Sequence, residues 1–124
     1  LALPFRKKSM ALFSSLNLVD KVPSPIQHLR EMNRVTRDKD AQFLLSDPFS
    51  WSTEAAPVKE WLGGKADGTF AGKGLVNVAE LLTNGQSELA PVWQVDAPGS
   101  VWWKIRTHSN HYELIRSCFV HASR

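Results

Sequence analysis

The sequence has very little cysteine and no long apolar run. Cys118 is the only cysteine among the 124 residues, so an internal disulfide and a cysteine-based zinc site are both excluded. The most apolar candidate segment, residues 10–19, is about half as long as the ~20 residues of a membrane-spanning helix. We therefore expect no transmembrane segment. A reducing compartment fits this composition, and peripheral association with a membrane stays open.

Motifs for catalysis and for cofactor binding are also missing. No serine has a G-x-S-x-G context, and Cys118 and His121 lie three positions apart on one predicted strand, on opposite faces. The glycine-rich segment 63–74 resembles a phosphate loop, but Lys73 is followed by Gly74 and not by Ser or Thr. We therefore interpret the segment as a mobile connector and predict no catalytic site and no cofactor.

Three of the four histidines lie near the end of the sequence. His108 and His111 flank a predicted turn, whereas His121 lies about ten residues further along a strand. At ~3.3 Å per residue this separation exceeds 30 Å, so one metal ion cannot bind all three. We predict no metal site.

Positive charge is concentrated in the first third of the chain. Residues 1–40 hold eight Lys or Arg against four Asp or Glu, whereas residues 41–124 hold seven against eight. Such a split indicates either a solvated basic segment or one that meets an acidic partner.

Residues 1–23 have the composition of an extended arm, basic at first and then apolar. Pro4 and Pro23 punctuate the segment, its apolar residues keep no period, and residues 1–19 contain three basic residues and no acid. That composition is typical of an organellar import segment or of its surroundings, so we expect a mitochondrial or plastid origin, or otherwise a cytoplasmic one. We predict that the apolar side chains of the arm are sheltered by another molecule.

The best helix signal covers residues 24–40. Ser24 is a suitable cap, Pro25 occupies the first helical position, and Arg30, Arg34 and Arg37 are expected to share one side as an arginine stripe. Weaker signals predict short helices over residues 52–63 and 77–85.

The periodicity changes from helical to alternating after residue 88. Residues 89–95, 101–107 and 111–121 are predicted strands, joined by turns at 96–100 and 108–110. Pro91 makes the first strand an edge strand. The predicted fold class is α+β: an arm (1–23), then one small domain (24–124) with amphipathic helices followed by a small three-stranded antiparallel sheet.

Alternation along residues 101–108 places Val101, Trp103 and Ile105 on a predicted core face. Trp102, Lys104 and Arg106 are then on the opposite face, which is free for a partner. Base stacking on Trp102 with phosphates on the two cations is one interpretation. Packing of the cationic stems along Trp102 is the other.

Residues 101–112 resemble the last hairpin of small microbial ribonucleases of the barnase type, which carries a Trp-bearing strand, a polar turn and a His-Tyr pair. The resemblance would make His111 a general acid. The preceding predicted strand has neither the carboxylate nor the arginine of that family, and only Glu88 lies just before it. The resemblance is therefore local, and family membership is not inferred.

We expect, first, a non-catalytic structural subunit of a larger, possibly organellar, multiprotein assembly, and second, an RNA-binding protein. A ribonuclease-like domain that uses His111 is the third hypothesis. The predicted partner-binding residues are Phe5, Arg6, Lys7, Lys8, Leu12, Phe13, Arg30, Arg34, Arg37, Trp102, Lys104 and Arg106.

Overall fold

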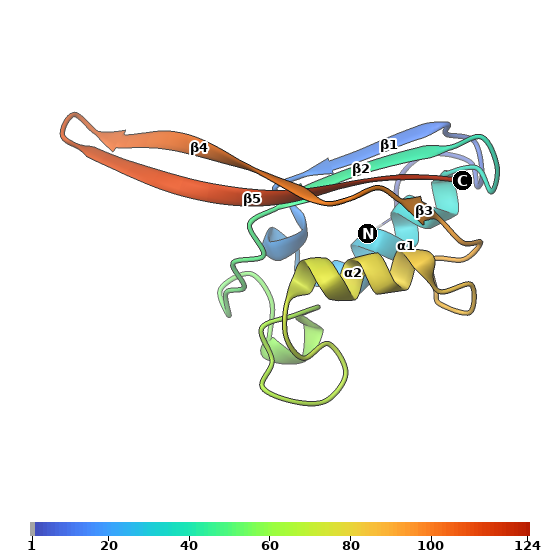
Figure 1. Ribbon diagram of the computed structural model, residues 1–124, viewed down its shortest axis with the longest axis horizontal. Helices are drawn as coiled ribbons and strands as arrows, with labels where there is room; N and C mark the ends of the chain where they lie inside the picture. Colours follow the sequence, from blue (N-terminus) through green and yellow to red (C-terminus); the bar gives the residue numbers. More distant parts are fainter. Residues whose placement is uncertain (1) are drawn as a thin grey trace.

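The computed structural model describes residues 2–124 as two α-helices packed on one face of a five-stranded sheet (Figure 1). The chain is thus a mixed α/β protein. The elements in chain order are β1 (Leu12–Leu16), η1 (Val19–Lys21), α1 (Pro25–Val35), β2 (Gln42–Asp47), η2 (Val58–Glu60), α2 (Gly74–Thr83), β3 (Gln94–Val95), β4 (Gly99–His108) and β5 (His111–Ser123).

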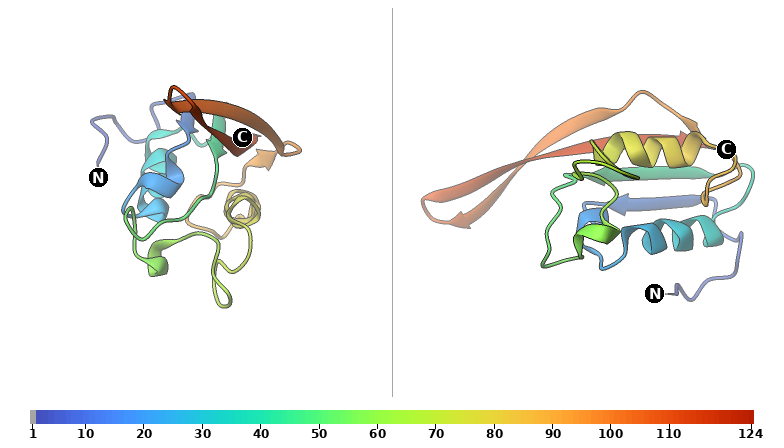
Figure 2. Two further views of the ribbon diagram at one scale, coloured as in Figure 1. Left: turned by 90° about the vertical axis from the view of Figure 1, so that its left-hand side faces the viewer. Right: turned by 90° about the horizontal axis from the view of Figure 1, so that it is seen from below.

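The sheet is organised around β5. Its last residues, 118–123, pair antiparallel with β2, which in turn pairs parallel with β1 at the edge. The other side of β5 pairs with the short β3 and with β4. The first half of β5, residues 111–117, pairs with β4 alone, so that the two strands continue as a hairpin beyond the rest of the sheet (Figures 1 and 2).

The hydrophobic core lies between the sheet and the two helices. Phe43 and Leu45 of β2 are opposite Ala122 and Val120 of β5, and all four are buried. Leu29 and Met32 of α1, Val78 and Leu82 of α2, and Trp93 complete the core from the helical side and the strand connection.

Residues 2–23 do not form the extended arm that was predicted for residues 1–23, because the protein itself satisfies much of their backbone, and Leu1 lies outside the described residues. Lys8, Ser9 and Met10 donate to the carbonyls of Arg34 and Val35 at the end of α1 (2.8–2.9 Å). The next residues form β1, and Val19 in η1 is fully buried. Parallel pairing with β2 could not be detected from sequence, since strands 12–16 and 42–47 are joined through a helix.

The predicted three-stranded C-terminal sheet is also corrected. Its three segments belong to one five-stranded sheet, and the first of them is reduced to Gln94–Val95. The predicted helix over 52–63 is a single 3-10 turn, Val58–Glu60. α1 begins at Pro25 as predicted but ends at Val35, and α2 begins three residues before the predicted Asn77.

Arg124 locks the end of β5 onto α1 and onto the strand connection. Its side chain is only 2% exposed, and its guanidinium donates to the side chain of Asn33 (2.9 Å) and to the carbonyls of Arg37 (2.9 Å) and Pro91 (3.0 Å). It also stacks on Trp93, 4.0 Å from the ring centroid. A planar five-donor fork suits this cluster of carbonyl acceptors, whereas a lysine ammonium does not.

We predict that Arg124→Met lowers the free energy of unfolding by about 1–3 kcal/mol, because the hydrogen bonds to Asn33, Arg37 and Pro91 and the stacking on Trp93 are lost. Arg37→Met is the matched control: the Arg37 side chain is exposed, so the same exchange there changes stability by less than about 0.5 kcal/mol. Urea unfolding measures both variants. Equal stability of the two would show that the Arg124 bonds do not hold the fold.

Candidate functional site

The hairpin formed by residues 100–117, hereafter the distal hairpin, is the most prominent surface feature. Between residues 2 and 124, its strands pair only with each other and leave both faces without a covering helix (Figure 1). Two-stranded hairpins are marginal in water, so side chains across the ribbon must hold it. The distal hairpin is therefore a candidate interaction surface.

One face of the distal hairpin combines aromatic, aliphatic and cationic side chains. The register places Trp102 opposite Arg116, Lys104 opposite Leu114 and Arg106 opposite Tyr112. These six residues are hereafter the cation–aromatic face. Trp102 and Leu114 are each 67% exposed, which is unusual for large apolar side chains so close together.

Two of the three cations of this face, Lys104 and Arg106, are held by contacts within the distal hairpin. The Lys104 ammonium lies 4.2 Å from the centroid of the Tyr112 ring, and the Arg106 guanidinium lies 5.6 Å from it. Arg106 also donates to the carbonyl of Ser109 in the turn (3.0 Å). Cation–π attraction of this kind is worth about 0.5–1 kcal/mol at an exposed site. The face is thus partly preorganised, while Trp102 stays available.

The opposite face of the distal hairpin is anchored to the sheet at its base. The Trp103 indole donates to the Ser117 hydroxyl (2.9 Å), which donates to the side-chain oxygen of Asn17 after β1 (2.7 Å). Trp103 and Ile105 are half-buried against the hairpin itself, and Val101 is exposed. The predicted core face is therefore wrong. Alternation along β5 puts Arg116 on the same side of the sheet as the buried Val120, so Val101, Trp103 and Ile105 lie on the side that carries no helix.

The sequence predicted Trp102, Lys104 and Arg106, but it did not predict Tyr112, Leu114 and Arg116 on the same face. The turn is Ser109–Asn110, and regular pairing around it would place Ser117 opposite Trp102. A register shift between Arg106 and His108 places Arg116 there instead. A β-bulge of this kind has no clear signal in the sequence, and it moves every partner on β5 to the other face.

The predicted basic residues of α1 do not form a free stripe. Arg30 is paired with Glu88, and Arg34 is paired with Glu31 and also donates to the carbonyls of Leu3 and Phe5 (both 3.1 Å). Arg37 lies beyond the end of the helix. Two of the three guanidinium groups thus have partners within the protein.

The predicted residues of segment 1–23 lie apart from the distal hairpin. Phe5, Arg6 and Lys7 are exposed beside the end of α1, and Lys8 is paired with Asp38. In β1 the alternation separates Leu12, on the uncovered face of the sheet, from Phe13, which packs on Phe43 with ring centroids 6.0 Å apart. The structure does not combine these residues with Trp102 in one surface.

The histidines and Glu88 do not converge on a common site. His111 lies at the tip of the distal hairpin and contacts the Thr107 hydroxyl, whereas Glu88 is bound to Arg30 beside α1. His121 contacts Asp96 (2.7 Å) and Gln42 (3.1 Å) in the sheet. Within the described part of the chain, no three His, Cys, Asp or Glu side chains are grouped as metal ligands.

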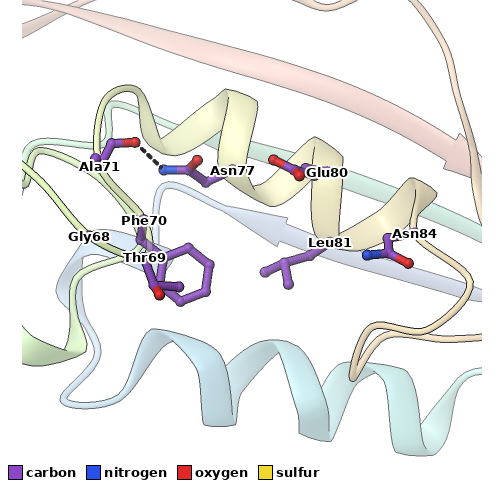
Figure 3. A pocket seen from close by; sticks show the side chains of 8 residues that line it. All are labelled: Gly68, Thr69, Phe70, Ala71, Asn77, Glu80, Leu81 and Asn84. Atoms are coloured by element: carbon purple, nitrogen blue, oxygen red, sulfur yellow. Dashed lines mark hydrogen bonds between the residues drawn. The ribbon is translucent and has the colours of Figure 1, made fainter.

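A cavity of about 400 Å³ lies between the glycine-rich segment and α2 (Figure 3). Asn77 of α2 donates from its side-chain amide to the carbonyls of Leu62 (2.9 Å) and Ala71 (3.0 Å). The backbone of Gly64 also donates to the carbonyl of Gly72 (2.7 Å), closing the loop on itself. The segment that was predicted to be a mobile connector is therefore tied to α2 at both of its ends.

Two buried carboxyl groups organise the chain after β2. Asp47 accepts from the backbone N–H of Phe49 (2.9 Å), and Asp20 accepts from that of Ser50 (2.8 Å). Both side chains are buried, so burial, together with the negative charge of Asp20, raises the pKa of Asp47 to about 6. These bonds fix a turn in which Phe49 has a left-handed backbone (φ +52°), an uncommon conformation for an aromatic residue.

No protein-family model matches this chain, and no curated protein matches it in sequence. The fold and the distal hairpin define the class of protein: a helix-backed mixed sheet that extends a cation–aromatic β-ribbon into solvent. None of its helices within residues 2–124 combines the length and the apolar character needed to cross a membrane.

We predict that Asp47 makes stability fall as the pH rises. Its folded-state pKa, about 6, lies above its ordinary value, so the folded protein keeps a proton that the unfolded chain releases. The resulting stability is complete below about pH 4 and lost as the pH rises through about 6, at most about 3 kcal/mol. Urea unfolding from pH 4 to 7 measures this slope.

Asp47→Asn should remove this downward contribution, so that the slope of stability against pH between 4 and 7 is more positive than in the wild type, whatever the variant's absolute stability. Glu31 and His28 contribute slopes of the opposite sign, because Arg34 lowers the pKa of Glu31 to about 2 and burial lowers the pKa of His28. Both groups are present in the wild type and in the variant, so the difference between the two slopes reports Asp47. A slope that is unchanged in the Asn variant would assign the pH dependence to another group.

Proposed function

We propose that this protein is a non-catalytic interaction subunit of a larger assembly and that it docks through the distal hairpin. The observation that carries the proposal is the exposure of Trp102 and Leu114 on a ribbon that projects away from the body of the protein (Figure 1). Leaving such side chains in water forfeits roughly 1–2 kcal/mol each relative to burial. A partner surface that covers them recovers this free energy.

The charges of the distal hairpin specify the partner. Lys104, Arg106 and Arg116 lie on the cation–aromatic face, and Glu113, the single acid of the hairpin, belongs to the opposite face. We infer a partner protein whose surface has an apolar patch for Trp102 and Leu114, flanked by carboxylates. Aromatic and arginine side chains are also the types that contribute most to interface energetics.

The segment 1–23 has a smaller role in this proposal than its composition predicted. Most of its backbone and part of its apolar surface are satisfied within the protein, but Phe5, Leu12, Leu16 and Leu18 remain exposed. These side chains supply a secondary contact area at most. An organellar setting stays a proposal that rests on the composition of residues 1–19.

The docking proposal predicts that Trp102→Ala with Leu114→Ala weakens the native partner at least a hundredfold, about tenfold for each side chain. The partner is first identified by mass spectrometry after capture with tagged protein from the native source. It is then purified, and its dissociation constant is measured for each variant. Binding should also weaken as salt rises, because the cationic side chains meet carboxylates.

Val58→Ala serves as the control, since Val58 is an exposed apolar side chain like Trp102 and Leu114 but belongs to η2, outside the distal hairpin. It should leave the dissociation constant unchanged. A partner that is retained by the hairpin variant, or released equally by the control, contradicts docking through the distal hairpin.

RNA binding is the second candidate, favoured by the same arrangement of Trp102 beside Lys104, Arg106 and Arg116. Aromatic stacking with adjacent cations is the usual way to bind single strands. A labelled single-stranded RNA titrated at rising salt tests it: Lys104→Gln should reduce the salt slope by roughly 0.7. A flat salt response in the wild-type protein excludes phosphate contacts at this face.

A further inference from the structure

A second cavity, of about 610 Å³, lies where the base of the distal hairpin meets α2 and the turn after β2. Its volume falls within the range of small-molecule sites. Phe49 and Trp51 line it from the turn, Val76 from α2, and Arg116 and Cys118 from β5. The cavity thus gathers segments that are far apart in the sequence, and it does not involve the exposed Trp102 and Leu114.

The aromatic wall of this cavity is built by close packing. Phe49 and Trp51 lie with ring centroids 6.1 Å apart, and Trp51 stacks on Trp61 at 6.3 Å. Gly74 permits this approach, because a Cβ at that position would lie 2.5 Å from the Phe49 ring. The buried Asp47 and Asp20 hold the turn from behind. The wall is therefore fixed before any ligand arrives.

The charged residues that line the cavity are both cations, Lys73 and Arg116. Among residues 2–124, neither side chain forms an ion pair with a carboxylate. This distinguishes Arg116 from Arg30 and Arg34, which are neutralised within the protein. A cavity with apolar aromatic walls and two unpaired cations favours a ligand with a flat apolar body and one anionic group.

We propose that this cavity binds a small organic anion, whose apolar body packs on Phe49 and Trp51 and whose anionic group pairs with Arg116, assisted by Lys73. The site shares Arg116 with the cation–aromatic face, but the apolar anchors of docking, Trp102 and Leu114, are not part of its lining. Cys118 provides an internal reporter, because this half-buried side chain lines the cavity and is the only thiol in the chain.

The experiment uses the dye 8-anilinonaphthalene-1-sulfonate as the probe, with its uncharged relative N-phenyl-1-naphthylamine as the comparison. Iodoacetamide alkylates Cys118, and mass spectrometry follows the rate on the full chain. We expect saturating sulfonate dye to slow alkylation at least fivefold and the uncharged dye to bind about tenfold more weakly. Equal affinities of the two dyes overturn the anion preference, and unprotected Cys118 overturns the site.

Two variants locate the binding. Arg116→Gln removes the cation and Val76→Glu adds an acid at the exposed mouth, and each should weaken the sulfonate dye about tenfold. Leu114→Ser removes an apolar side chain from the distal hairpin without adding a charge beside Arg116, and it should leave the dye affinity unchanged. Circular dichroism checks the fold of each variant, and Arg116→Lys, which keeps the charge, should retain most of the affinity.

An equal loss in Leu114→Ser and Val76→Glu would place the dye on the exposed hairpin and overturn the proposal. That outcome leaves the docking function intact, since docking is tested with the protein partner and with different variants. Conversely, loss of the protein partner in the Trp102 and Leu114 variant, with unchanged protection of Cys118, separates the two sites.

Discussion

The shared use of β5 is the constraint on which the rest of the structure depends. Residues 118–123 must pair with β2 on one side and with β3 and β4 on the other, which fixes the strand within the sheet. Residues 111–117 then continue in the same direction with β4 as their only neighbour. Because a strand rises by about 3.3 Å per residue, this half extends over 20 Å beyond the last β2 pair. The distal hairpin is thus a consequence of strand length, and Arg124 holds the opposite end of the strand against α1.

The projecting distal hairpin buries less apolar surface than the rest of the sheet, and the core must offset this loss of stability. A ribbon without a covering layer buries its side chains only against each other, so Trp103 and Ile105 are half-buried and Trp102 remains mostly exposed. The compact half of the protein offsets this with a core of Phe43, Leu45, Trp93 and their neighbours from both helices. Natural proteins rarely keep large apolar side chains exposed in a group unless a partner covers them. The asymmetry between a well-packed half and an unsatisfied half is therefore the main physical argument for an interaction role.

The sequence predicted those features that depend on local patterns. Proline at the first helical position marked the start of α1, and alternation placed Trp102, Lys104 and Arg106 on one face. Features that depend on long-range contacts could not be predicted, each for a physical reason. β1 needs a parallel partner that is some thirty residues away, and its own pattern is too short to predict a strand. The bulge near Thr107 decides that Arg116 and not Ser117 is opposite Trp102. Segment 63–74 is closed by a backbone hydrogen bond from Gly64 to Gly72 and by the side chain of Asn77, which donates to Ala71. Secondary-structure propensities do not predict contacts of this kind.

Arg116 belongs both to the docking face and to the proposed anion site. It lies opposite Trp102 on the cation–aromatic face, and it also lines the cavity at the base of the distal hairpin. A side chain at this junction can be held by an anion in the cavity or be left free beside Trp102, and those two states differ in the charge that the hairpin presents to a partner. Two binding sites are coupled when a shared group makes different contacts in the bound and free states of one of them, as Arg116 would here. A ligand that engages Arg116 therefore reduces the positive charge beside Trp102, which acts against a carboxylate-bearing partner. The reciprocal effect follows by linkage, since a partner that binds Arg116 weakens the anion by the same factor.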